Sequence, residues 1–199
     1  MDNCQDVQQE TESEIVSFDT EQLILVNRAD DEIGHLSKAE CHLGDGILHR
    51  AFSLFIFNQS GELLIQQRSK KKRLWPLCWA NSCCSHPRRG ETMEQAIHRR
   101  LDQELGLTSN LKYLYKFIYQ AQYGALGAEH EYCWVYIGQS CGSVTANENE
   151  IEDWRFVTPE DLDLELARRP DRFTPWLKLE WERIRNEFSA EIRALVSAH

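Results

Sequence analysis

Three histidines and two glutamates in this sequence carry donor atoms that divalent metal ions accept. His42 and His49 are seven residues apart, and Gly44 and Gly46 between them would let the chain curl and bring the two imidazoles together. Each histidine taken singly is more often a packing or surface residue than a ligand. Mixed nitrogen and oxygen donors admit Mn, Fe, Zn or Mg at roughly 2.0 to 2.2 Å, so a site built from them would take one of these ions.

The two glutamates stand at the start of a predicted strand over residues 131–138. Because side chains alternate along a strand, Glu129 and Glu131 share a face with Cys133, whereas His130 points the other way. Two carboxylates that lead an apolar face are costly to desolvate unless they are paired or bind a metal, and a strand end that projects into water is the alternative. The donor set assembled in this way is His42, His49, His86, Glu129 and Glu131.

A short segment carries nucleophilic side chains, and basic residues lie on both sides of it in the sequence. Residues 81–87 read Asn-Ser-Cys-Cys-Ser-His-Pro, which by itself is most simply a turn with buried cysteines. Basic side chains that could converge on one diphosphate are Lys38, Arg68, Lys72 and Arg100. Arginine offers phosphate a planar fork and lysine a point charge. Arg100 and Glu104 are four residues apart on one helix, so a plain intrahelical ion pair remains an alternative for them.

Strands and helices are expected to alternate irregularly around these residues. Hydrophobic patterning predicts strands over residues 23–26, 52–58, 62–68, 111–122, 131–138 and 154–157, with helices over 92–105 and from 158 and 174 onward. Thr92 and Gln95 have capping-box spacing, and Gly106 stands where a left-handed C-terminal cap belongs. The last helix is expected to run on through an apolar stripe that includes Phe188 and Leu195. This mixture, without a strict βαβ order, predicts the α+β class.

Length, charge and cysteine content limit the functional class. The 199 residues suit one domain, expected over residues 21–199 and preceded by an acidic tail or docked extension over residues 1–20. A net charge of −10 argues against nucleic-acid and membrane partners, which select basic surfaces. No apolar run approaches the roughly 18 residues of a membrane span, and no signal-peptide core is present. Seven cysteines, an odd number, suit reduced thiols, so we expect a cytoplasmic protein that is a monomer or weak homodimer.

The segment over residues 63–87 resembles the signature of type 1 isopentenyl-diphosphate isomerases. The resemblance rests on Arg68, the basic residues 70–73, Trp75-Pro76, Trp79 and the motif at 81–87. Further matches follow in the same order at residues 38–42, 48–53, 129–131 and 173–176, so the likeness spans about residues 22–178. It implies a Nudix-like fold, a mixed β-sheet sandwich flanked by helices, with an extra C-terminal helix.

The Nudix motif itself, G-x5-E-x7-R-E-U-x-E-E-x-G-U, is only partly present. When Gly106 is set on its last glycine, the residues in register are Glu91, Arg99, Glu104 and Leu107. Ser85 replaces the first glycine, Arg100 the glutamate of the R-E pair, and Gln103 the first glutamate of the E-E pair. Only one of the last three carboxylates is left, so the metal site of a pyrophosphohydrolase is lost and an isomerase is favoured.

The resemblance also implies a role for individual residues. One divalent ion, Mn²⁺ or Mg²⁺ with Zn²⁺ as an alternative, would be bound by His42, His49, His86, Glu129 and Glu131. A Mg²⁺ that bridges the diphosphate would be held by Glu104 and the carbonyl of Cys84. Positions that match diphosphate contacts are Lys38, Arg68, Lys72, Ser85 and Arg100. Cys84 and Glu131 match the catalytic pair, and Tyr119 and Trp176 match aromatic groups that line the pocket.

These expectations describe an isoprenoid-pathway enzyme that interconverts isopentenyl diphosphate and dimethylallyl diphosphate by metal-dependent protonation and deprotonation. Its partner would be a small isoprenoid diphosphate. A Nudix-type hydrolase of a nucleoside diphosphate derivative is the nearest alternative. A second alternative is a non-catalytic protein with a structural zinc at His42, His49 and His86.

Overall fold

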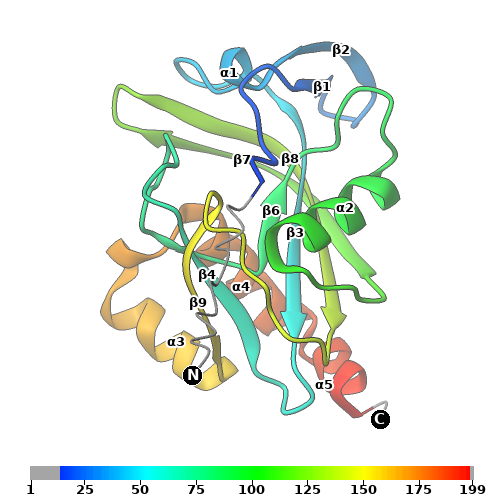
Figure 1. Cartoon of the computed structure of the whole chain (residues 1–199), viewed down its shortest axis with the longest axis vertical. Helices are drawn as coiled ribbons and strands as arrows, with labels where there is room; N and C mark the ends of the chain where they lie inside the picture. Colours follow the sequence, from blue (N-terminus) through cyan, green and yellow to red (C-terminus); the bar gives the residue numbers. More distant parts are fainter. Residues whose placement is uncertain (1–13, 198–199) are drawn as a thin grey trace, which may run out of the picture.

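The strands form one mixed sheet that carries helices on both faces. The structure, a computed structural model, describes residues 14–197. Its strands are β1 (Gln22–Val26), β2 (Glu32–Ser37), β3 (His49–Phe57), β4 (Leu63–Arg68), β5 (Trp79–Ala80), β6 (Cys83–Ser85), β7 (Lys112–Tyr123), β8 (Gly127–Gln139) and β9 (Ile151–Val157). Its helices are α1 (Lys38–Cys41), α2 (Met93–Leu105), α3 (Pro159–Arg168), α4 (Pro175–Glu187) and α5 (Ser189–Ser197), with a 3₁₀ turn η1 over Pro170–Arg172 (Figure 1).

Strand β3 is the centre of the sheet. It pairs in parallel with β8 from His49, opposite Glu131, to Phe57, opposite Gln139. It also pairs antiparallel with β6, where Ser53 lies opposite Cys84. The sheet is therefore mixed, and β3 brings segments that are far apart in the sequence to the same end of the molecule.

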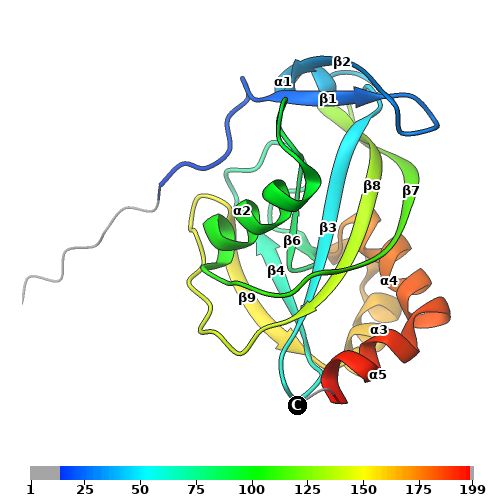
Figure 2. The ribbon, with the colours of Figure 1, turned by 90° about the vertical axis from the view of Figure 1, so that its right-hand side faces the viewer.

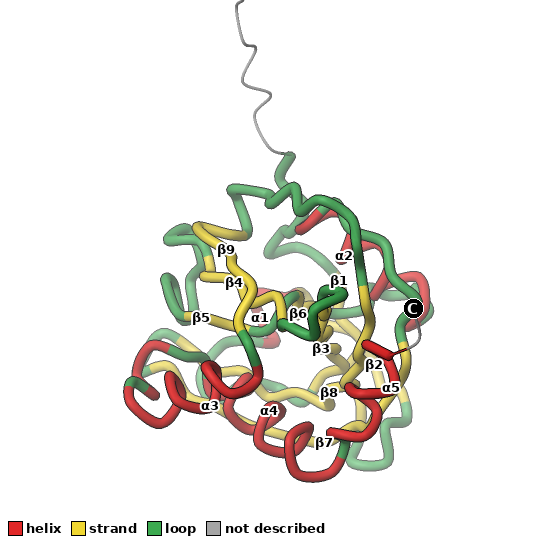
Figure 3. The backbone as a smooth tube through the Cα atoms, turned by 90° about the horizontal axis from the view of Figure 1, so that it is seen from below, coloured by secondary structure: helices red, strands yellow, loops and turns green. Residues whose placement is uncertain are grey.

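Alternation along β3 separates the core into two layers. Phe52, Leu54 and Ile56 are buried with the apolar face of α2. Phe55 and Phe57 are buried with apolar side chains of α3, α4 and α5 on the opposite face. Figures 2 and 3 show these helices on either side of the strands. Removing both faces of the sheet from water is the main favourable contribution to the free energy of folding of such a sandwich. The mixture of strands and helices confirms the α+β class.

Helix α2 begins and ends as its sequence predicts. Thr92 accepts a hydrogen bond from the Gln95 backbone N–H at 3.2 Å, and the Gln95 side chain accepts one from the Thr92 backbone N–H at 2.9 Å. Gly106 follows in the left-handed conformation with φ of 64°. The capping box and the glycine cap are both present, because each depends only on residues within one turn.

Two local expectations were wrong or incomplete. The C-terminal helix is interrupted at Phe188, whose φ of −124° ends α4 before α5 begins at Ser189. At this break the Phe188 ring stacks on Tyr115 with centroids 5.2 Å apart, a contact the periodicity could not reveal. Strand β2 was not predicted, because its polar and glycine-containing sequence becomes a strand only through pairing with β1. Among residues 14–197, no helix has the length and apolar character needed to cross a membrane.

Candidate active site

The three histidines and two glutamates lie together at one end of β3 and β8. One potential ligand atom from each of them falls within 4.8 Å of the other four. The imidazole centroids of His42, His49 and His86 are 4.8 to 5.4 Å apart. His42 follows α1, His49 begins β3, His86 follows β6, and both glutamates lie on β8, so the pairing around β3 assembles the cluster. All five side chains are buried.

Backbone carbonyls orient two of the imidazoles. Nδ1 of His42 donates to the Lys38 carbonyl oxygen at 2.7 Å, and Nδ1 of His49 donates to the Ile47 carbonyl oxygen at 2.7 Å. A carbonyl only accepts, so Nδ1 of each ring carries a proton; Nε2 of His42 lies 2.8 Å from Oε2 of Glu129. Nε2 of His49 is buried and has no hydrogen-bond partner among the described residues. Burial also lowers the pKa of His49 to about 3, which keeps this imidazole neutral and able to bind a metal.

The two carboxylates differ in their electrostatic state. Burial alone would raise the pKa of Glu129, but His42 beside it outweighs this effect and lowers the pKa to about 2. Burial and the charge of Glu129 hold the pKa of Glu131 well above its usual range. Two buried carboxylates this close are both stable as anions only beside positive charge. Five buried nitrogen and oxygen donors with an unpartnered imidazole lone pair therefore fit a divalent ion.

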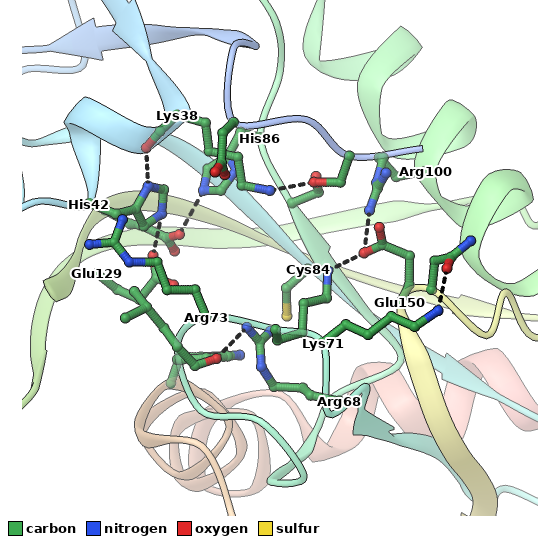
Figure 4. A pocket seen from close by; sticks show the side chains of 18 of the residues that line it. Lys38, His42, Arg68, Lys71, Arg73, Cys84, His86, Arg100, Glu129 and Glu150 are labelled. Carbon is green, nitrogen blue, oxygen red and sulfur yellow. Dashed lines mark hydrogen bonds and ion pairs between the residues drawn. The ribbon is translucent and has the colours of Figure 1, made fainter. Parts of the chain in front are cut away.

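A thiol and a phenol adjoin this cluster. The Cys84 thiol donates to Oδ1 of Asn81 at 2.7 Å. The Tyr119 hydroxyl donates to Oε2 of Glu131 at 2.7 Å, because β7 places Tyr119 opposite Glu131. Cys84, Tyr119 and Glu131 line one cavity of about 340 Å³ together with Trp176. Figure 4 shows Cys84 in this cavity with two residues of the histidine–glutamate cluster, His86 and Glu129. The cavity thus combines weak acids with the side chains that could bind a metal ion.

The wall of the same cavity carries a positive charge that is unusual for an acidic chain. The predicted diphosphate-contacting residues that line it are Lys38, Arg68, Lys72, Ser85 and Arg100. Burial, together with nearby Lys72, lowers the pKa of Lys38 to about 8, so bound anion would favour its charged form. The cavity can therefore hold an anionic group as well as the acids.

Comparison with known proteins gives the family. The NUDIX domain model matches residues 47–177. Isopentenyl-diphosphate Delta-isomerase 1 of Photorhabdus laumondii is 40% identical over 163 residues, which are 81% of this chain and 93% of that protein. The enzymes named isopentenyl-diphosphate Delta-isomerase from Serratia proteamaculans and Paenarthrobacter aurescens are 41% and 38% identical, over 78% and 83% of this chain and 87% and 91% of theirs.

This chain belongs to the isopentenyl-diphosphate Delta-isomerase family. Solved structures agree on the fold. DR0079 from Deinococcus radiodurans superposes with a TM-score of 0.67 at 25% identity, over 82% of this chain and 98% of that one. A MutT protein from Methanosarcina mazei, at 17% identity and a TM-score of 0.60 over 71% of this chain and 96% of its own, shows the fold alone. The Nudix-like architecture is confirmed, and family membership supports the isomerase over the Nudix hydrolase alternative.

In this member of the isomerase family, the carboxylates that remain of the Nudix motif are paired with arginines. Glu91 pairs with Arg99, and Arg100 pairs with Glu104 one turn along the helix. Arg100 also contacts Glu150 at 3.1 Å. A guanidinium at a motif position that carries a carboxylate in hydrolases favours anion binding there over metal binding.

Glu104, like His49, is a predicted site residue that does not line the cavity. It is buried, and besides Arg100 it accepts a hydrogen bond from Nε2 of Gln66 at 3.2 Å. The intrahelical pair that the sequence left open is therefore formed. Trp176 lines the cavity as expected, and the guanidinium of Arg68 lies 5.2 Å from its ring centroid.

Several cavity residues were missed by sequence reasoning. Glu150 is buried and pairs with Lys72 as well as Arg100, so a carboxylate stands against two of the predicted diphosphate contacts. Ser17 contacts Lys38, and the Val16 carbonyl oxygen accepts from Arg100 at 2.8 Å. Nothing in the local pattern around these residues marks them, because they reach the site only through the fold. Of the tail expected over residues 1–20, residues 1–13 lie outside the described residues, whereas Ile15, Ser17 and Asp19 line the cavity.

Proposed function

We propose that this protein interconverts isopentenyl diphosphate and dimethylallyl diphosphate by moving a carbon–carbon double bond. The observation that carries the proposal is a single cavity that combines Cys84, Tyr119 and Glu131 with a five-donor metal cluster and a cationic wall. Membership of the isopentenyl-diphosphate Delta-isomerase family supports this substrate. A structural zinc site would instead be closed by four ligands and would not need an adjoining cavity of acids.

The cationic wall would bind the diphosphate and leave the hydrocarbon near the acids. Arg68 and Arg100 offer forked donors, and Lys38 and Lys72 offer point charges. Binding energy from this non-reacting part of the substrate can be used to orient the alkene. Since Glu150 pairs with Lys72 and Arg100, a diphosphate would exchange places with this carboxylate.

The reaction needs one group to give a proton and another to take one. Protonation of the terminal alkene carbon leaves a tertiary cation, and loss of a proton from C2 places the double bond between C2 and C3. An alkene is a very weak base, so the acid must be close and shielded from water. Burial raises the pKa of Cys84, and burial with the charge of Glu131 raises that of Tyr119, so both are protonated at neutral pH. We assign the exchange to Cys84 and Glu131, with Tyr119 hydrogen-bonded to Glu131.

The metal complement is part of the proposal. Mn²⁺ or Mg²⁺ would occupy the five-donor cluster, with Zn²⁺ as the third candidate, and would neutralise Glu129 and Glu131 so that both can ionise. Glu104 and the Cys84 carbonyl would hold a second Mg²⁺, which would supply positive charge for the diphosphate, and Glu104 would then exchange its pair with Arg100 for this ion. We place the enzyme in the cytoplasm as a monomer or weak homodimer.

The proposal is tested by following the proton. Purified protein is incubated with isopentenyl diphosphate and Mg²⁺ in D₂O, and the products are examined by NMR. We expect dimethylallyl diphosphate that carries deuterium, since at least one transferred proton exchanges with solvent. Release of phosphate without isomer, or an unchanged substrate with every candidate metal, would reject the assignment. A panel of dinucleotides assayed for phosphate release serves as the comparison for hydrolase activity.

A further inference from the structure

Behind Cys84 lies a buried polar chain that does not line the cavity. Its members after Cys84 are Ser53 on β3, Cys133 on β8 and Glu180 on α4. Sγ of Cys84 is 3.5 Å from Oγ of Ser53, which is 3.4 Å from Sγ of Cys133. Sγ of Cys133 is 3.3 Å from Oε1 of Glu180. The four side chains therefore connect α4 to the thiol at the cavity through consecutive hydrogen-bonding distances.

Burying the carboxyl group of Glu180 at this position carries a desolvation cost. Its exposed fraction is 0%, and its Oε2 has no hydrogen-bond partner among residues 14–197. An aliphatic side chain would pack in the surrounding apolar layer without that desolvation cost. Burial raises the pKa of Glu180 to about 8, so at neutral pH it is an uncharged carboxylic acid that can donate a hydrogen bond. Packing alone gives no reason for such a group.

A donor at the far end of the chain sets the direction of the other hydrogen bonds. Cys133 has one S–H and three possible acceptors, which are Ser53, Glu180 and, at 4.0 Å, the Trp134 carbonyl oxygen. If the Glu180 acid proton goes to Sγ of Cys133, the Cys133 proton is left for Ser53, and the Ser53 proton is left for Cys84. The Cys84 proton in turn faces Oδ1 of Asn81. Sγ of Cys84 is then held between one donor, Ser53, and one acceptor, Asn81.

We propose that Glu180 is a positioning residue for Cys84. Glu180 acts through Cys133 and Ser53, which form a chain of hydrogen bonds directed at the Cys84 sulfur. The inference rests on the proposed function of Cys84 in proton exchange. The Ser53 hydroxyl supports negative charge on the sulfur at the stage when its proton is on the substrate. The effect is therefore confined to the reacting state and acts on kcat, whereas diphosphate contacts act mainly on KM.

The test compares variants of Glu180 and Ser53. Glu180→Gln keeps an N–H donor of the same shape, so we expect kcat within about threefold of the parent enzyme. Glu180→Met and Ser53→Ala remove the donor, and we expect kcat to fall about tenfold with KM changed less than about twofold, the effect of one lost hydrogen bond in the reacting state. Tyr115→Phe is the matched control, since the Tyr115 hydroxyl donates to the Glu180 backbone oxygen at 3.2 Å and leaves the carboxyl untouched.

A second readout does not depend on isomerase activity. The rate at which iodoacetamide alkylates Cys84, followed by peptide mass spectrometry, is expected to fall in Ser53→Ala and Glu180→Met and to stay unchanged in Tyr115→Phe. Parent kcat in Glu180→Met, or equal losses in Glu180→Met and Tyr115→Phe, would overturn the proposal. If Glu180→Met does not fold, Ser53→Ala decides, and an unchanged alkylation rate in that variant refutes the chain. Failure of the unsubstituted protein to isomerise would reject the proposed function alone.

Discussion

At the scale of single residues, the site holds its two proposed proton carriers with different partners. Cys84 lies between Asn81 and Ser53, whereas Glu131 is hydrogen-bonded by Tyr119 and His86. Burial raises the pKa of both groups, so each favours its protonated form until positive charge is added. Metal beside Glu131 and not beside the Cys84 sulfur would separate the two pKa values, which is the condition for one group to give a proton while the other takes one.

Removing either group is expected to stop isomerisation. Cys84→Ala and Glu131→Gln should each lower kcat by about 10³-fold, the range of a lost general acid or base, with pyrophosphate affinity little changed. Steady-state assays and calorimetric titration with inorganic pyrophosphate measure the two effects. Cys83→Ala is the matched control, because the neighbouring Cys83 is packed in the core layer against α2 and does not line the cavity. Near-normal turnover in Cys84→Ala would remove this thiol from the reaction.

At the scale of elements, α2 depends on a cap whose geometry only glycine adopts easily. Gly106 has φ of 64°, and a Cβ there would lie 3.0 Å from Cβ of Thr145. Gly106→Ala should therefore lower the free energy of unfolding by about 1 to 2 kcal/mol for the left-handed conformation, and further through the contact. Urea denaturation measures the change. Gly90 is the control, because its φ of 79° is also positive but a Cβ there would meet open space, so Gly90→Ala should lower the free energy of unfolding less. Equal losses in the two variants would mean that the contact with Thr145 is relieved by a shift of that side chain.

At the scale of the whole molecule, the metal cluster joins segments that span residues 42–131. A bound ion should therefore stabilise the native state, by about 2.7 kcal/mol at a concentration 100 times its dissociation constant. For a chain of this size, chelation with EDTA should lower Tm by roughly 5 to 10 °C, and Mn²⁺ should restore it. Scanning calorimetry gives the values. His49→Ala should lose the response, whereas His98→Ala, which changes a partly exposed histidine paired with Glu94 on α2, should keep it. A Tm indifferent to metal in the parent protein would contradict the site.

Stability of the whole molecule should also depend on pH through Glu180. Its pKa is raised from 4.5 in the unfolded chain to about 8 in the folded one, first because of burial, so between these values the folded state binds the extra proton. The stabilisation is complete below pH 4.5 and is lost as pH rises, at about 1.4 kcal/mol per pH unit. Chemical denaturation of Glu180→Gln from pH 5 to 8 should show a shallower decline than the parent protein. Parallel profiles would mean that Glu180 is ionised throughout.

Features set by a few neighbouring residues could be obtained from the sequence alone. The capping box of α2 and the Gly106 cap both depend on interactions within one turn. Alternation on β8 placed Glu129 and Glu131 on one buried face. The family resemblance supplied the five metal donors as a set, and the structure brings their atoms together.

Only the tertiary structure decided how distant segments meet. Parallel pairing of β3 with β8 and the stacking of Phe188 on Tyr115 join residues far apart in the chain. Strand β2 instead forms by pairing with β1, its neighbour in the sequence. Glu150 and Glu180 are ordinary acidic residues in the sequence, and they matter because packing buries one against Lys72 and Arg100 and the other behind Cys84. Local patterns specify hydrogen bonds within a turn, whereas burial and desolvation, which set the chemistry of these carboxyl groups, arise only when the layers close.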